Sequence, residues 1–394
     1  MKYTRLTWYS LTVIFFFAGL GTGRREFFLL FFIMAFVVLY ALALNLWTIF
    51  SFSFIQELSQ QSAVKGSTVF LKTGIYNDKP FPFTMMRILA ETVTPDGVYE
   101  LRFNLSPKSS IDFIIPVSCP YRGIYNVGMT KLETNDVLGL TKTSFNIRGL
   151  PYYRQRTIKI LPKVVELPYL PTRNTDAKFS GAALNLSEDG ENFADLRRHR
   201  PGDPFKRIHK PVSAKKQELY VRTYDIPLET AVLIAIDPSM DLGEGEYSRY
   251  MADLACQCVT AIADISLRSG FTVEFAGIDL SRSLRRKNKR EILTALCDTL
   301  AELPFDKQGD FDSMLGSAIT GSGGFRAAYI ISASSPEVYA GHLLRLYREG
   351  CHVCCLRIAS ADGSTDGDDL IRGIHCIPVK FGDDIRTVLT GGQV

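Results

Sequence analysis

Residues 231–241 read AVLIAIDPSMD, and this stretch decides the fold of the C-terminal half of the 394-residue chain. Its first six residues are apolar, which predicts a strand that is buried on both faces. The strand ends in a loop of acids and hydroxyls that contains Asp237, Ser239 and Asp241. Because ligands of open α/β sheets bind at the carboxyl ends of strands, this loop is a candidate site.

Downstream of this strand, apolar runs alternate with amphipathic segments. Helical spacing predicts helices over 247–269, 290–303 and 336–349. Short apolar runs predict strands over 271–278, 327–332, 352–358 and 374–379. This alternation predicts a mostly parallel sheet with helices on both faces.

Upstream lies a basic, turn-rich segment, residues 190–224, which reads GENFADLRRHRPGDPFKRIHKPVSAKKQELYVRTY. Residues 197–216 hold eight Lys or Arg against the single acid Asp203. We expect one short helical turn over 193–200 and then a turn at Pro201-Gly202-Asp203-Pro204. The prolines at 168, 171 and 201 disfavour a long helix in this region.

Residues 62–165 have the pattern of an all-β domain. Strand-like runs recur every 10–15 residues, with Pro, Gly, Asn or Asp between most of them. This spacing predicts a small antiparallel sandwich. The expected strands are 64–76, 84–90, 98–105, 111–117, 123–129, 144–147 and 156–161.

The first 50 residues contain two apolar segments separated by Gly21-Thr22-Gly23-Arg24-Arg25-Glu26. Residues 27–50 run for 24 residues without a charge, long enough to cross a hydrocarbon core of ~30 Å as a helix. Residues 6–23 are just long enough to do the same. We therefore expect a hairpin of two transmembrane helices; a single anchor or a signal peptide is the alternative.

Charge and cysteine usage bear on the compartment and the partners. One side of the hairpin carries three basic residues, Lys2, Arg5 and Lys65, and the other carries two, Arg24 and Arg25. The positive-inside rule therefore slightly favours a cytoplasmic location for the rest of the chain. Seven of the eight cysteines follow residue 250 within apolar periodic segments, which is typical of reduced, buried thiols. The net charge of +4 gives no support to a nucleic-acid partner, and we expect none.

The basic segment resembles the central motif of the domain-of-unknown-function 58 family, membrane proteins with a C-terminal von Willebrand factor A-like domain. The residues that carry the likeness are Gly190, Phe193, Leu196-Arg197, Arg200-Pro201-Gly202-Asp203, Arg207-Ile208-His209, Lys210, Ser213-Ala214, Leu219 and Val221-Arg222. The family's Trp between His209 and Lys210 is missing here. Two upstream elements, Tyr121–Tyr125 and Asp136–Leu140, also resemble the family, so the likeness spans the chain.

The resemblance implies a multi-domain organisation. We expect a transmembrane hairpin (1–55), a β-sandwich-like domain (62–165), a connector carrying the motif (166–229) and an α/β von Willebrand A-like domain (230–394). Such proteins are often encoded beside MoxR-type AAA+ ATPases. The expected function is a non-enzymatic, multi-pass membrane scaffold with such an ATPase as its protein partner.

The same resemblance implies a divalent-ion site. Related A domains bind the ion through Asp-x-Ser-x-Ser after the first strand, with a Thr and a second Asp from later loops. Here Asp237, Ser239 and Asp241 match the first element, which suits Mg²⁺ or Ca²⁺. The later partners have no match, because Ser332-Ala333-Ser334-Ser335 follows the central strand. The alternative is that Asp237 and Ser239 bond the local backbone and cap their own loop.

The motif itself is a second candidate site for a partner or a phosphate. Its residues are Arg197, Arg200, Gly202, Asp203, Arg207, His209 and Lys210. Arginine forks suit phosphate and carboxylate, which leaves open an alternative function as an envelope enzyme or as a lipid- or phosphate-binding factor. The other readings are contact with anionic lipid headgroups, and an internal Arg207–Asp203 pair whose neighbours are solvated.

The remaining His and Cys residues give weaker signals. Strand alternation places Cys351 and Cys355 on one face and His352 and Cys354 on the other, which divides the ligands that a zinc site would need. His199 and His209 have no identifiable Ser and Asp partners, so a hydrolase triad is not supported.

Overall fold

The computed structural model describes residues 2–50, 52–94, 97–136, 139–171, 193–198, 210–216, 218–224, 231–280, 288–305, 310–321, 324–359 and 374–391. The chain divides into two compact units, residues 1–161 and 162–394. The first holds two apolar helices and a β domain, and the second holds an α/β domain and a short basic segment.

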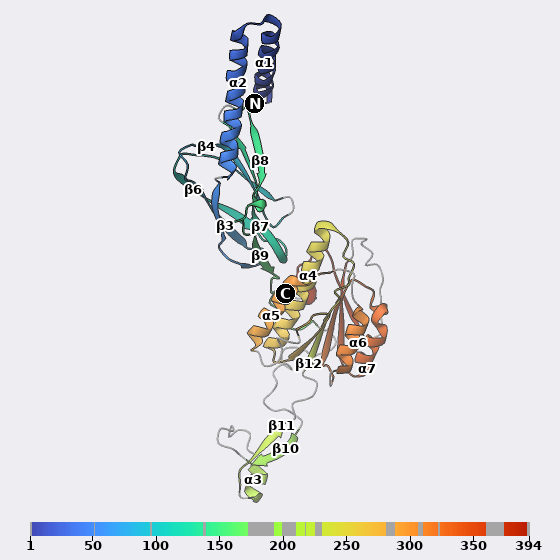
Figure 1. Cartoon of the computed structure of the whole chain (residues 1–394). Coiled ribbons are helices and arrows are strands. Elements are labelled where there is room, and N and C mark those ends of the chain that lie inside the picture. The colour runs from blue at the N-terminus through green and yellow to red at the C-terminus, as the bar shows by residue number, and fades with distance from the viewer. Residues whose placement is uncertain are drawn as a thin grey trace. The chain divides into compact units, whose positions relative to one another are not determined.

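Helices α1 (Lys2–Thr22) and α2 (Arg25–Phe50) run side by side (Figure 1). Aromatic side chains hold them together: the ring centroids of Phe16 and Phe31 lie 5.0 Å apart, and those of Phe15 and Phe27 lie 6.4 Å apart. Near the turn, a Cβ at Gly19 would lie 3.2 Å from the Phe28 ring, so the glycine permits this close approach.

Two of the described helices are long and apolar enough to cross a membrane. One is α2, and the other is α4 (Gly245–Arg268), whose apolar 18-residue window is 89% buried inside the α/β domain. Helix α4 is therefore a core helix by its surroundings. Helix α2 lies near the N-terminus, where length and composition do not separate a membrane span from a signal sequence.

The β domain is a sandwich of two sheets around one core. The first sheet has the order β1-β3-β6, with β1 (Ser53–Leu58), β3 (Thr68–Asn77) and β6 (Ser109–Ser118) antiparallel. The second has the order β2-β9-β7-β4-β5, with β8 also paired to β7. Its strands are β2 (Ser62–Val64), β4 (Phe83–Glu91), β5 (Val98–Leu105), β7 (Gly123–Asn135), β8 (Lys142–Asn146) and β9 (Arg156–Leu161).

Side chains from both sheets fill this core. Leu71 and Ile115 of the first sheet share it with Ile88, Met129 and Ile158 of the second, and all are fully buried. The expectation of an antiparallel sandwich needs one correction, because β2 pairs with β9 in parallel. Strand β1 was not expected: it begins at Ser53, inside the range 1–55 that the sequence assigns to the hairpin.

The α/β domain holds a five-stranded sheet in which every pair is parallel. The strand order is β13-β12-β14-β15-β16. The strands are β12 (Ala231–Ile236), β13 (Thr272–Ala276), β14 (Ala327–Ser332), β15 (His352–Ile358) and β16 (His375–Val379). Numbered within the domain this is the doubly wound order 2-1-3-4-5, so the switch point lies between β12 and β14.

Helices cover both faces of this sheet (Figure 1). One core contains α4, α5 (Lys289–Glu302) and α8 (Ile385–Leu389) with Val232, Ile234 and Ile236 of β12. The other contains α6 (Phe311–Gly321) and α7 (Ala340–Arg348) with Leu233 and Ala235. The alternation of β12 residues between two cores explains why its sequence is apolar without a break.

Two elements differ from the sequence expectation. The helix expected over 336–349 divides into a 3₁₀ turn, η4 (Pro336–Tyr339), and α7, with Ser335 capping the turn. The helical turn expected over 193–200 is wrong: Phe193–Arg198 is strand β10, antiparallel to β11 (Tyr220–Tyr224). Pairing between residues 22 to 31 positions apart in sequence decides this conformation, which the local propensity of 193–200 does not predict.

Candidate functional site

The buried carboxylate of Asp237 lies at the switch point of the parallel sheet. It follows β12 directly, and its backbone N–H donates to the carbonyl of Ile331 in β14 at 2.9 Å. Only 1% of Asp237 is exposed. Ser332, the last residue of β14, is also buried, so the ends of the two central strands meet here.

Four hydrogen bonds reach this carboxylate. Ser239 donates its backbone N–H (2.9 Å) and its hydroxyl (2.6 Å) to Oδ1 of Asp237. The hydroxyls of Ser332 (2.8 Å) and Tyr339 (2.9 Å) donate to Oδ2. A carboxylate has about four lone-pair positions, so these donors fill its acceptor capacity. The arrangement stabilises a buried negative charge that would otherwise be costly.

Tyr339 is the part of this network that lies farthest away in sequence. It ends η4, is 6% exposed, and packs edge-on against Phe311 of α6 at 5.2 Å. Burial raises the pKa of Tyr339 above its ordinary value, because the phenolate is disfavoured away from water. The phenol therefore stays protonated at neutral pH and keeps donating to Asp237.

The donor set does not fit a metal ion bound directly to Asp237 in this arrangement. Each carboxylate oxygen is already engaged by two donors, whereas Mg²⁺ and Ca²⁺ need open oxygen ligands. Asp241 is exposed, and its Oδ1 accepts the N–H of Gly243 at 3.1 Å. Within the described residues there is no group of three or more His, Cys, Asp or Glu able to hold an ion. Metal binding through Asp237, Ser239 and Asp241 stays a prediction.

An aromatic cluster lies at the same, carboxyl edge of the sheet, in which Phe381 is exposed and Tyr247 and Tyr250 are half-buried. Phe381, two residues beyond β16, is 58% exposed. Its ring lies 4.4 Å from that of Tyr250 and 5.6 Å from that of Tyr247, both in the first turns of α4. The hydroxyl of Tyr247 donates to the carbonyl of Ala359, just after β15, at 3.2 Å. A solvent-exposed aromatic ring held in place by half-buried neighbours is typical of protein interfaces.

The described part of the basic motif forms a strand pair and a short helix. Arg197 lies in β10 opposite Val221, and Lys210 begins α3 (Lys210–Lys216). The hydroxyl of Ser213 accepts the N–H of Tyr220 at 2.9 Å, which ties α3 to β11. Lys216 lies over the Tyr220 ring at 4.9 Å. Arg200, Gly202, Asp203, Arg207 and His209 lie outside the described residues.

A third constellation joins the helix pair to the β domain. The guanidinium of Arg5 donates to the carbonyl of Gly139 at 2.5 Å and to Oδ1 of Asn135 at 3.1 Å. The side chain of Asn45, in α2, donates to the Thr141 hydroxyl. Asp136 closes this loop by accepting the N–H of Leu140 at 2.7 Å. The sequence of Asp136–Leu140 gave no sign that these residues contact the apolar helices.

The cysteines are buried or half-buried thiols. Cys351 and Cys355 lie in one core and Cys354 in the other, as strand alternation predicts. Burial raises the pKa of Cys258 to about 12 and that of Cys297 to about 11. Both thiols are therefore poor nucleophiles at neutral pH.

Comparison with known proteins gives no relative that identifies the chain. No protein-family model matches it, and no curated protein matches it. Among solved structures, a β-glucosidase from Listeria innocua in complex with gluconolactone matches 28% of this chain at 8% identity, with a TM-score of 0.17 over 16% of that chain. The sporulation control protein Spo0M from Bacillus subtilis matches 28% at 12% identity, with a TM-score of 0.17 over 49% of that chain.

A third structure, β-glucosidase 3B from Thermotoga neapolitana in complex with α-D-glucose, matches 27% of this chain at 12% identity, with a TM-score of 0.13 over 16% of that chain. The chain thus spans under half of the length of each of these proteins. Likenesses at this level carry no argument about fold or function.

Proposed function

We propose that this protein is a membrane-anchored scaffold that binds a protein partner at the carboxyl edge of its parallel sheet. The observation that carries the proposal is the saturated carboxylate at the switch point. Asp237 accepts four hydrogen bonds from its own chain, so it has no lone pair left for the proton of a substrate. The position that holds ligands in related sheets serves here to fix the loops around it.

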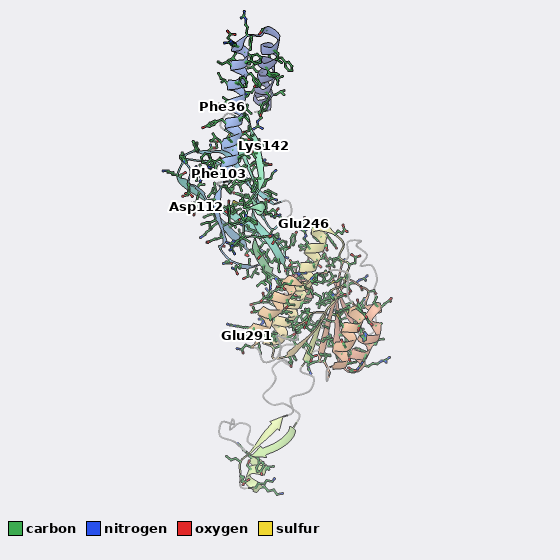
Figure 2. The ribbon with its side chains drawn as sticks, in the orientation of Figure 1. Phe36, Phe103, Asp112, Lys142, Glu246 and Glu291 are labelled. Carbon is green, nitrogen blue, oxygen red and sulfur yellow. The ribbon has the colours of Figure 1, made fainter. Side chains whose placement is uncertain are left out.

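The helix pair supports the anchor. Helices of 21 and 26 residues are about 31 and 39 Å long, enough to cross a bilayer. Their outer surfaces are apolar: Phe17, Phe32 and Phe36 are 64%, 65% and 68% exposed, and Phe36 is labelled in Figure 2. A soluble monomer rarely exposes apolar surface on this scale, and a bilayer would cover it. Arg24 and Arg25 in the turn mark the far end of the hairpin.

On this proposal both helices span the membrane and the body lies in the cytoplasm. A C-terminal fluorescent-protein fusion, which matures only in the cytoplasm, tests the side. A C-terminal alkaline phosphatase fusion reports the opposite side. Activity of the phosphatase without fluorescence would overturn the cytoplasmic placement, and release of the protein by alkaline carbonate would overturn the anchor.

The partner surface is the aromatic cluster of Phe381, Tyr247 and Tyr250. The resemblance to membrane proteins that accompany MoxR-type AAA+ ATPases makes such an ATPase the partner to test. The measurement is binding of a purified MoxR-type ATPase from the same organism to the full-length protein in lipid nanodiscs. Truncating an aromatic anchor in an interface commonly costs 2 kcal/mol or more, so Phe381→Ala should weaken binding by about thirtyfold.

Tyr347 provides the matched control. It is 47% exposed at the end of α7, where the chain enters β15 and hence at the amino edge of the sheet. Tyr347→Ala should leave the affinity unchanged. An ATPase that does not bind, or that binds both variants equally weakly, would remove this surface from the proposal.

A second candidate function uses the basic motif as a phosphate site. The exposed lysines of α3, Lys210 and Lys215, support it. Titration calorimetry of the full-length protein with inorganic phosphate tests it. Saturable binding that Arg207→Ala abolishes would favour this function, and the absence of heat would remove it.

A further inference from the structure

Two lysines and a phenylalanine lie on adjoining turns of the β domain, next to the end of α2. The turn after β3 carries Lys79 and Phe81, and the turn before β6 carries Lys108. The backbone N–H of Lys108 donates to the carbonyl of Lys79 at 3.1 Å, so the two lysines start from neighbouring points of the backbone. Lys79 is half-buried and Lys108 is exposed.

A buried asparagine holds both turns in place. Asn77 is 1% exposed, and its Nδ2 donates to the carbonyls of Phe81 (2.8 Å) and Ser106 (2.9 Å). Its Oδ1 accepts the N–H of Lys79 at 3.1 Å. One side chain therefore fixes the backbone on which Lys79 and Phe81 sit and the start of the turn that holds Lys108. The two cations and the ring are presented by a rigid frame.

These turns contact the base of the helix pair. The ring of Phe81 packs edge-on against Trp47 of α2 at 5.6 Å, and the two side chains are 38% and 51% exposed. Between them lies a cleft of about 80 Å³, with Asn45, Thr84 and Lys79 in its walls. This volume equals that of two or three water molecules, so the cleft takes only a few atoms of a bound molecule.

The charges of this surface are unbalanced. Neither lysine forms an ion pair with a carboxylate in the described part of the chain. Asp136, which also lines the cleft, accepts three hydrogen bonds from Leu140 and Thr141 and keeps its negative charge. The guanidinium of Arg5 balances that charge, because it donates to the carbonyls of Gly139 and Thr141 in the same loop. Asp78 is the remaining exposed acid of the turn. The surface is thus net positive. If α1 and α2 are anchored as proposed, it lies at the depth where Trp and Tyr meet the headgroups of a bilayer.

We infer that Lys79, Lys108, Trp47 and Phe81 form a binding site for an anionic phospholipid headgroup of the bilayer that holds α1 and α2. The phosphate meets the two ammonium groups, and the aromatic pair packs beside the glycerol region of the same lipid. This inference rests on the proposed anchor. Each basic residue near an anionic surface enriches such lipids about fivefold, and Asp78 offsets one of the two.

Trp47 itself reports on the site. The chain has two tryptophans, Trp8 and Trp47, and the indole N–H of Trp8 makes no hydrogen bond among the described residues. Trp8→Phe therefore gives a full-length protein with one reporter. The variant is placed in nanodiscs of phosphatidylcholine and phosphatidylglycerol at one fixed ratio, with bromine on the acyl chains of either lipid. The measured quantity is the quenching of Trp47 per mole of brominated lipid.

The expected result is that brominated phosphatidylglycerol quenches about fivefold more strongly than brominated phosphatidylcholine, and less so at high salt. Lys79→Ala with Lys108→Ala should bring the ratio to one, whereas the two Lys→Arg changes should preserve it. Lys72→Ala is the control: it removes an exposed lysine of β3 that lies about 17 Å before the end of the strand, and it should leave the ratio unchanged.

The outcomes separate the site from the anchor. Equal quenching by both lipids in the parent protein overturns the site and leaves the anchor standing. A ratio that survives the double alanine change, or that falls equally with Lys72→Ala, also overturns it. Quenching by neither lipid would show that α2 is not in the bilayer, and the site would fall with the anchor.

Discussion

The hydroxyl of Tyr339 donates a 2.9 Å hydrogen bond to the buried carboxylate of Asp237, across 102 positions of sequence. This bond ties the loop after β12 to the 3₁₀ turn after β14. It crosses the point at which the strand order of the sheet reverses, where the loops of such folds are most often shaped for ligands. Removing one atom, the hydroxyl oxygen of Tyr339, therefore tests how much this bond stabilises the junction.

Removing that hydroxyl should destabilise the α/β domain. Tyr339→Phe keeps the ring against Phe311 and takes one of four donors from a buried charge. Hydrogen bonds to charged groups contribute about 1.5–3 kcal/mol. Urea unfolding of the full-length protein in detergent should show a loss of this size. Tyr347→Phe, at an exposed tyrosine, should change stability by less than about 0.5 kcal/mol, and equal losses in the two variants would contradict the assignment.

Gly277 is the second constraint on the same junction. It follows β13 with φ +80°, and a Cβ there would lie 1.8 Å from the carbonyl oxygen of Ile236, the residue before Asp237. Gly277→Ala must therefore displace the end of β12 as well as strain its own backbone. Gly350 has φ +84° with open space around it, so Gly350→Ala strains the backbone without a steric clash. We expect Gly277→Ala to lower the free energy of unfolding by about 1–3 kcal/mol more than Gly350→Ala.

Strand positions in the α/β domain were predictable because each strand is one unbroken apolar run. The bounds of β12, β14 and β15 agree with the sequence expectation, since burial on both faces leaves little room for other residues. Helix α6 was missed, because Gly316, Ser317 and Gly321 weaken its helical pattern. Strand β1 was missed because it follows the apolar helix with only two residues between them.

Only those contacts of the site that join residues close in sequence were predictable. The sequence offered local backbone bonding by Asp237 and Ser239 as the alternative to an ion site, and the 2.9 Å bond from the Ser239 N–H to Asp237 is of that kind. The sequence showed that Ser332 stands where the resemblance leads one to expect an acid. It did not predict that the Ser332 hydroxyl donates to Asp237. The sequence did not predict the role of Tyr339, because helical periodicity does not indicate which hydroxyl will contact a carboxylate in another loop.

Acid should weaken the β domain through Glu133. Hydrogen bonds from Lys131 and then Lys142, both at 2.9 Å, lower the pKa of Glu133 from 4.5 to about 2. A depressed carboxyl pKa adds stability that is present above pH 4.5 and is lost as the pH falls toward 2. In the parent protein the free energy of unfolding should fall as the pH is lowered across this window. Glu133→Gln should flatten that dependence, whereas Glu57→Gln, at an exposed acid of β1, should leave it unchanged.

The junction between the helix pair and the β domain should loosen when Asn45 is removed. Asn45 is 3% exposed and donates to the Thr141 hydroxyl, next to the amide of Leu140 that Asp136 holds at 2.7 Å. A hydrogen bond between polar side chains in such a setting contributes about 0.6–2 kcal/mol. In Asn45→Ala, amide exchange at residues 139–141 should therefore rise about threefold to thirtyfold, as measured by hydrogen–deuterium exchange of the protein in nanodiscs.

The control for Asn45 lies one turn along the same helix. The hydroxyl of Thr48 donates to the carbonyl of Leu44 in α2 itself at 2.9 Å, so Thr48→Ala removes a bond internal to the helix. Exchange at residues 139–141 should be the same in this variant as in the parent. Unchanged exchange in Asn45→Ala would show that Arg5, through its bonds to Gly139 and Asn135, holds the loop without help from α2. In that case Arg5→Ala should produce the loss of protection that Asn45→Ala did not.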